Sequence, residues 1–385
     1  MIYNYLLRNL IRKWGKLEMI NGERIKQARE LRGLTQTELA RGIKTTQSTI
    51  AQIENGLILP SEIILQRIIL KTGFPLSFFK QPTSVDFPLG SLLFRARASM
   101  TLHERNVARQ YARTIFEVAE KMETHFEKIP SHLPCMDDDV VGSAIQTRSS
   151  LGLSPDSPII NLLNTVEQNG VMVIALPVKL SNQDAFSVWV ARRPVIILSG
   201  ASESGDRLRF NVAHEIGHLV MHRGIIGDVK RLQEEANEFA GELLMPKQAI
   251  LKEISIPVTL ATLIPLKKRW KVSIQALIRR AYELEIISQR QYKYLMQQLS
   301  SRGWRLKEPI DIPKEKPRLI SQMAEKLYGL PIDHKSLASN MNLSFQLVQE
   351  MIEAHTIKND HNRAIQNSNA TLLKFKKIDN TENTG

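Results

Sequence analysis

The sequence predicts a mostly helical α+β protein, with a bundle of five short helices at the N-terminus followed by a domain that combines a small sheet with a His-Glu-x-x-His helix. Three observations predict this fold class. Apolar residues recur at helical spacing in short runs that end at Gly33 and Gly42. Short β-branched runs lie between residues 170 and 199. Finally, His214 and His218 are four residues apart, which puts both imidazoles on one face of a helix.

Length and composition set the class of protein. A chain of 385 residues is long enough for two or three domains, since single cores usually stop growing near about 250 residues. No apolar run approaches the roughly 20 residues that span a bilayer, so we expect no membrane partner. The single cysteine, Cys135, precludes an internal disulfide and fits a reducing cytoplasm. The net charge of +13 favours a polyanionic partner.

Residues 1–18 are a basic and partly apolar extension. They lack the continuous apolar core and the small-residue cleavage site of a signal peptide. A much more regular segment begins at Met19, so we interpret Met19 as the natural start and residues 1–18 as an upstream extension. The alternative is a frayed helix that caps the first domain.

The five-helix bundle is expected in residues 19–82. Thr35 lies three residues before Glu38, which is the capping-box pattern that begins a helix. A tight turn follows at residues 43–45, and the next helix runs from about Thr46 to Glu54. Two short helices separated by such a turn form a common DNA-reading unit.

The outward positions of the helix after the turn carry short polar side chains. Such side chains reach base edges, and glutamine can pair with adenine through two hydrogen bonds. The residues expected to contact DNA are Gln36, Lys44, Gln47, Ser48, Thr49 and Gln52. Among them, Gln36 is placed to bond a phosphate, and Lys44 is placed with Arg41 to meet the DNA backbone.

Residues 34–40 and 48–56 closely resemble the phage-repressor helix-turn-helix family, of Cro/C1 or XRE type. The resemblance implies a repressor-like bundle that binds double-stranded DNA. It also implies a homodimer, because the half-sites of such operators are usually paired. The alternative is a bundle that binds only protein and presents these polar residues as a solvated face.

The rest of the chain divides into a second domain and flanking segments. Residues 83–154 are expected to hold a linker and a long helix, and residues 155–309 the domain with the small sheet. A small helical module is expected at residues 318–357, and a polar, disordered tail at residues 358–385. The sequence shows no internal repeat.

The segment from Phe210 to His222 contains the His-Glu-x-x-His motif. On one helix face, His214 and His218 can bind a single zinc ion, while Glu215 is placed to take a proton from metal-bound water. We interpret His222 as a supporting residue or a helix end rather than a ligand.

The motif and the later residues 234–246 resemble the ImmA/IrrE family of metallopeptidases. The resemblance implies a zincin-like fold, Zn²⁺ as cofactor, and an acidic third ligand on the second helix. The family often has glutamate four residues before the asparagine of this segment, where this chain has Gln233. Because glutamine is a poor zinc ligand, the role is assigned to Glu235 or Glu234, with a preference for Glu235.

The two resemblances together imply a cytoplasmic transcriptional regulator with a zinc-dependent endopeptidase domain. The implied substrate is a repressor-type protein, in stress or mobile-element regulation. The alternative is a DNA-binding regulator whose metal domain is a non-catalytic ligand sensor or a relic.

Overall fold

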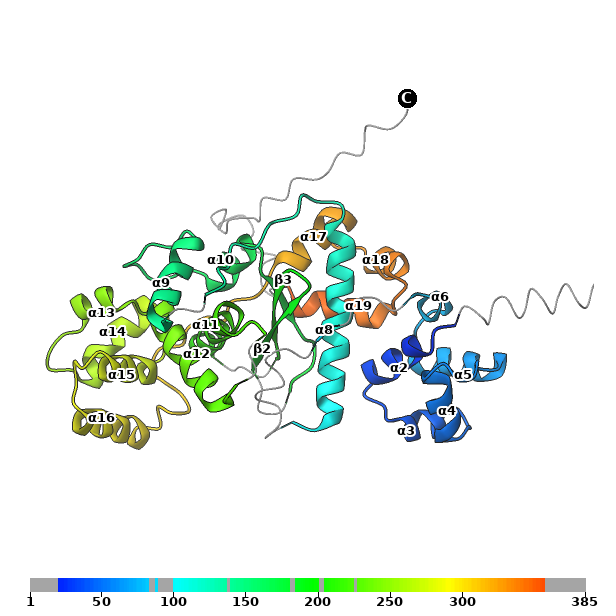
Figure 1. Cartoon of the computed structure of the whole chain (residues 1–385), viewed down its shortest axis with the longest axis horizontal. Helices are drawn as coiled ribbons and strands as arrows, with labels where there is room; N and C mark the ends of the chain where they lie inside the picture. Colours follow the sequence, from blue (N-terminus) through cyan, green and yellow to red (C-terminus); the bar gives the residue numbers. More distant parts are fainter. Residues whose placement is uncertain are drawn as a thin grey trace, which may run out of the picture. The chain divides into compact units, whose positions relative to one another are not determined.

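The computed structural model describes residues 20–82, 87–88, 100–136, 139–180, 184–200, 204–224 and 227–356 (Figure 1). The extension at residues 1–18, the start proposed at Met19 and the tail at residues 358–385 lie outside the described residues. The chain forms two compact units. The first unit combines residues up to Phe87 with 100–123 and 321–354, and the second contains residues 124–320.

The first unit begins with the predicted bundle of five short helices. These are α2 (Gly22–Leu31), α3 (Gln36–Gly42), α4 (Gln47–Glu54), α5 (Glu62–Thr72) and α6 (Leu76–Phe79). The helices meet around fully buried side chains, among them Ile25, Leu39, Ile50 and Phe79. Gly73 ends α5 in the left-handed conformation, which glycine adopts without steric cost.

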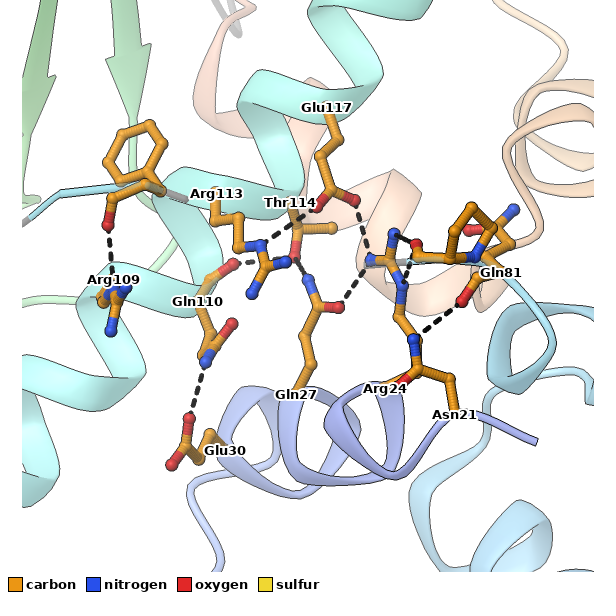
Figure 2. A network of polar contacts seen from close by, with 12 residues as sticks. Asn21, Arg24, Gln27, Glu30, Gln81, Arg109, Gln110, Arg113, Thr114 and Glu117 are labelled. Carbon is orange, nitrogen blue, oxygen red and sulfur yellow. Dashed lines mark hydrogen bonds and ion pairs between the residues drawn. The ribbon is translucent and has the colours of Figure 1, made fainter. Parts of the chain in front are cut away.

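Four more helices complete the first unit. They are α8 (Leu102–Glu123), α17 (Leu319–Tyr328), α18 (His334–Met341) and α19 (Phe345–Ala354). Figure 2 shows the polar contacts between α2 and α8. The Gln27 amide donates to Thr114 Oγ1 at 2.9 Å, and the Gln110 amide donates to Glu30 Oε2 at 2.7 Å. Because these groups are buried, their pairing avoids the cost of unsatisfied polar atoms.

The second unit contains a three-stranded sheet and eight helices among its described residues. The strands are β1 (Met172–Ala175), β2 (Ala185–Val190) and β3 (Arg193–Leu198). The helices are α9 (Val140–Ser150), α10 (Leu162–Gln168), α11 (Gly205–Met221), α12 (Val229–Leu244), α13 (Lys247–Glu253), α14 (Leu260–Trp270), α15 (Ile274–Glu283) and α16 (Gln289–Ser301). The sheet order is β1-β3-β2, with β1 parallel and β2 antiparallel to β3. The predicted fold class, mostly helical with a small sheet, is confirmed.

The core of the second unit forms where α11 packs against α12. Gly217 on α11 permits this approach, because an added Cβ would lie 3.1 Å from the Phe239 ring. Every residue of α11 from Val212 to Met221 is buried. The His-Glu-x-x-His motif therefore lies on a helix within the core of the second unit.

Buried ion pairs hold the segment after α16 onto this core. Lys267 is buried and pairs with both Asp206 and Glu308. Arg209 pairs with Glu315 in the same way. None of the helices in the described parts of the chain is long and apolar enough to cross a bilayer.

Candidate metal centre and nucleic-acid interface

The turn of the first unit has the local chemistry of a helix-turn-helix. Thr35 and Glu38 form the predicted capping box at the start of α3. Lys44 occupies the turn with a φ of 57°, and Thr46 caps α4 through its hydroxyl. These residues fix where α4 begins and therefore which of its side chains face outward.

The predicted DNA-contacting residues lie in two groups. Lys44, Gln47, Ser48 and Gln52 are exposed on the turn and on α4. Thr49 is only half-exposed, and its hydroxyl bonds Thr46 Oγ1 at 2.8 Å. The outward face of α4 is thus polar and uncharged, which suits base edges more than phosphates.

A chain of side-chain bonds holds α4 on the bundle. Buried Arg29 on α2 donates two hydrogen bonds to the Glu54 carboxylate, at 2.6 and 2.9 Å. The Gln36 amide donates to the same carboxylate, and its oxygen accepts from the Gln47 amide at 2.7 Å. The structure therefore brings Gln36 and Gln47 together, and this pairing orients Gln47 before any DNA arrives.

The two histidines of the motif face each other. Their Nε2 atoms are 3.1 Å apart, and both residues are buried, with His214 1% and His218 5% exposed. Two nitrogens of a tetrahedral zinc site with bonds of about 2.0–2.1 Å would lie about 3.3 Å apart. The spacing of the pair therefore fits zinc.

Hydrogen bonds to the far side of each ring favour this use. The Nδ1 of His214 lies 2.8 Å from Asn237 Oδ1, and the Nδ1 of His218 lies 2.9 Å from His222 Nδ1. The Nε2 of His222 in turn lies 2.9 Å from Glu235 Oε2, and the other oxygen of Glu235, Oε1, accepts a hydrogen bond from Arg231.

The proton positions in this relay follow from its charges. Burial lowers the pKa of His222, against the opposing effect of Glu235, so its ring is neutral at neutral pH. Burial raises the pKa of Glu235, but the hydrogen bonds from Arg231 and His222 outweigh this effect. The pKa therefore lies below its usual value, and the carboxylate is ionised at neutral pH. With His222 neutral and Glu235 ionised, one consistent arrangement has His222 donating from Nε2 and accepting at Nδ1 from His218. In that arrangement the proton of His218 lies on Nδ1 and its Nε2 faces His214, the geometry that a metal ligand needs.

The third position beside the pair is occupied by Gln233. Its side-chain nitrogen lies 3.0 Å from His218 Nε2, and turning the amide over would put its oxygen there. Helical spacing explains this place, since Gln233 is four residues before Asn237 and shares its face of α12. Among the described residues, no three His, Cys, Asp or Glu side chains gather as a metal-ligand group.

The two glutamates predicted as third ligands lie elsewhere. Glu235 supports His222 on the far side of His218, as described above. Glu234 is 68% exposed and lies 3.9 Å from Lys230 on the outer face of α12. The structure does not bring either carboxylate to the facing Nε2 atoms.

Glu215 is fully buried beside β2. The Ser187 hydroxyl donates to its Oε2 at 2.7 Å. Ser187 belongs to the strand at one edge of the sheet, so the carboxylate is oriented by the strand that borders the motif helix.

Comparison with known proteins identifies the two parts. Residues 25–79 match the family model described as helix-turn-helix, and residues 166–282 match the peptidase family model described as IrrE N-terminal-like domain. The chain joins an XRE-type helix-turn-helix domain to an IrrE-like domain. No curated protein matches the chain. A crystal structure of Bacillus thuringiensis PlcR in complex with the peptide PapR7 and DNA is 12% identical over 87% of this chain and 95% of that chain, but its TM-score of 0.15 defines no shared fold.

Several residues of the IrrE-like domain escape sequence reasoning. Asn237 lies in residues 234–246, but nothing in the sequence indicates that its side chain contacts His214. The sequence does not predict the hydrogen bond between Ser187 and Glu215, because only the packing of β2 against α11 brings the two residues together. Gln233 does have a signal, since it stands where the family often has glutamate, four residues before Asn237.

Proposed function

We propose that the chain is a cytoplasmic DNA-binding regulator in which α4 reads an operator and the IrrE-like domain holds zinc. The observation that carries the zinc assignment is the pair of buried Nε2 atoms 3.1 Å apart, a spacing that fits two nitrogen ligands of one zinc ion.

In this proposal His214 and His218 hold the metal, and the Gln233 amide oxygen takes the third position. Asn237 and the relay of His222 and Glu235 keep both rings in the required tautomer. When bound, zinc supplies a Lewis acid that lowers the pKa of a coordinated water.

Glu215 is the general base of the proposal. Its carboxylate is buried, and the Ser187 hydroxyl fixes the orientation of one of its oxygens. The reaction proposed is hydrolysis of a peptide bond in a repressor-type protein, with Glu215 removing the proton from the attacking water.

Gln233 also favours a second candidate function. A neutral amide gives zinc less electrostatic stabilisation than the carboxylate of a His₂Glu site. A weakly held metal suits a sensor that responds to zinc or to a ligand more than it suits a peptidase. The two candidates share the metal pair and differ in whether Glu215 performs turnover.

The cleavage test uses the zinc-loaded chain with candidate repressor-type substrates. We expect Glu215→Gln to keep zinc but to cut at least about 10²-fold more slowly, the range of general-base effects. Cleavage by that variant at the wild-type rate would exclude Glu215 as the base. Zinc binding without cleavage of any substrate would support the sensor.

The DNA test uses sites that the full-length chain selects from random double-stranded DNA. We expect the Gln47→Ala and Gln52→Ala double variant to weaken binding to those sites at least about tenfold, since each good base contact contributes roughly 1–3 kcal/mol. Binding should also fall steeply with salt. Unchanged affinity in the double variant would contradict base reading by α4.

A further inference from the structure

The helices that complete the first unit, α17 to α19, repeat the backbone landmarks of its helix-turn-helix. Caps, turn conformation and backbone hydrogen bonds of α3 and α4 recur 298 residues later in α18 and α19. The N-cap Thr35 of α3, for example, corresponds to the N-cap Asp333 of α18. The Leu-Ala pair at residues 39–40 is buried inside the first turn, and the Leu-Ala pair at 337–338 is buried inside the second. Only this dipeptide is shared in sequence, so no repeat is visible before folding.

The two turns have the same conformation. Lys44 has a φ of 57° and Asn342 has a φ of 56° at the equivalent position. Thr46 caps the helix after the first turn, and Ser344 accepts from the backbone after the second. Four backbone hydrogen bonds recur with the same spacing: Leu39–Thr35 with Leu337–Asp333, Lys44–Arg41 with Asn342–Ser339, Thr45–Ala40 with Leu343–Ala338, and Ile50–Thr46 with Val348–Ser344.

We propose that residues 319–354 form a second helix-turn-helix, whose turn is a docking surface for α2 and α8 rather than a DNA-reading element. The two turns match in two N-caps, one left-handed residue and four backbone hydrogen bonds, although their side chains differ. The side chains around the second turn therefore determine what the second copy binds.

The second copy lacks the chemistry for DNA. Ser339 and Asn342 stand where the first copy has the cations Arg41 and Lys44. Its outer helix, α19, carries Glu350 and Glu353 and no lysine or arginine. With no cations at the turn or on α19, and with acidic groups on the helix that would enter the groove, association of this helix with phosphates is unfavourable.

The second turn is covered, whereas the first is open. Ser344 is 7% exposed, while its counterpart Thr46 is exposed. The Arg32 guanidinium at the end of α2 donates to Ser344 Oγ at 2.9 Å and to the Thr72 carbonyl at 2.6 Å. One cation of the first copy thus joins the end of α5 to the turn of the second copy.

The other side of the turn meets α8. The Lys121 ammonium donates to the Asn340 carbonyl at 2.5 Å. Met341 and Leu343 line a cavity of about 220 Å³ together with Val118 and other residues of α8. The turn is therefore held by cations of α2 and α8, and it belongs to the same unit as the proposed DNA-reading helix.

One arm of the test measures DNA binding by the full-length chain on the selected sites, and it rests on the proposed function. Gln346→Ala with Gln349→Ala, on the outer face of α19, should leave the Kd within about twofold. A tenfold loss of affinity would show that the second copy reads DNA and would overturn the proposal. If the first-copy variants of Gln47 and Gln52 also bind normally, the proposed DNA reading by α4 fails, but the docking inference does not.

The second arm measures amide hydrogen exchange and does not depend on DNA. Leu343→Ala, and the milder Ser344→Ala, should speed exchange several-fold in peptides from α2 and α8. The matched control is Leu70→Ala, at a position 83% exposed on α5, which should leave α2 and α8 unchanged. Exchange in both turn variants equal to that of the control would overturn docking by the second copy.

Discussion

At the scale of single residues, the proposed metal pair depends on side chains that lie behind it. His218 Nδ1 lies 2.9 Å from His222 Nδ1, and His222 Nε2 lies 2.9 Å from Glu235 Oε2. In the proposed site, this relay places the proton of His218 on Nδ1. Arg231 in turn keeps Glu235 ionised. A carboxylate two side chains behind a ligand thereby selects the tautomer of that ligand.

Replacement of that carboxylate should weaken zinc binding. Glu235→Gln allows His222 either tautomer, so we expect zinc affinity to fall about 10–100-fold, the usual effect of an outer-shell change. Competition with a chromophoric chelator measures it. The matched control is Glu234→Gln, on the exposed face of the same helix, where affinity should not change. Equal affinity in both variants would remove Glu235 from the relay.

A second buried carboxylate should make stability depend on pH. Burial raises the pKa of Glu167 to about 8, although the backbone amides of Arg318 and Leu319 lower it. A pKa raised on folding favours the protonated folded chain, so stability is greatest below about pH 4.5 and falls as the pH rises toward 8, by about 1.4 kcal/mol for each pKa unit. This loss should be absent in Glu167→Gln.

Melting temperatures of the wild type and of Glu167→Gln between pH 5 and pH 9 test this prediction. The two curves should diverge as the pH rises, with the variant the more stable at pH 9. Parallel curves would mean that Glu167 is ionised in the folded chain throughout this range.

At the scale of elements, the ion pair between Arg29 on α2 and Glu54 on α4 holds the proposed DNA-reading helix in place. Arg29 and Glu54 are both buried, so the removal of one partner leaves an uncompensated charge. We expect Arg29→Ala to lower the free energy of unfolding by about 3–5 kcal/mol. The control Lys26→Ala, exposed on the same helix, should change it by less than about 0.5 kcal/mol. Chemical denaturation followed by far-UV circular dichroism compares them.

Element positions were largely predictable from sequence. The capping box at Thr35, the turn at residues 43–45 and the strands between residues 170 and 199 follow from local patterns, and the structure confirms them. The partners of Glu215 and His214 were not predictable, because Ser187 and Asn237 reach them only through packing of distant elements. Gln233 stands where the resembled family often has glutamate, and its amide lies beside His218, whereas the carboxylates of Glu234 and Glu235 lie away from the facing Nε2 atoms.

At the scale of the whole molecule, the order of the chain links the two units. The first unit is built from segments on both sides of residues 124–320, so the second unit is an insertion in it. The sequence predicted a small helical module at residues 318–357 but no internal repeat. The repeat is not detectable in the sequence because the two turns share only the Leu-Ala dipeptide. The proposed DNA-reading helix therefore lies in the first unit and the proposed metal pair in the second.

The measurement that tests the central claim most directly is zinc content of the untagged full-length chain, by mass spectrometry after equilibration with buffered zinc. It is compared with His218→Ala and Gln233→Glu. We predict about one zinc per chain in the wild type, none in His218→Ala, and at least about tenfold tighter binding in Gln233→Glu, because a carboxylate replaces a neutral amide. Equal zinc in the wild type and His218→Ala, or no zinc in any of the three, would contradict a metal centre at the facing histidines.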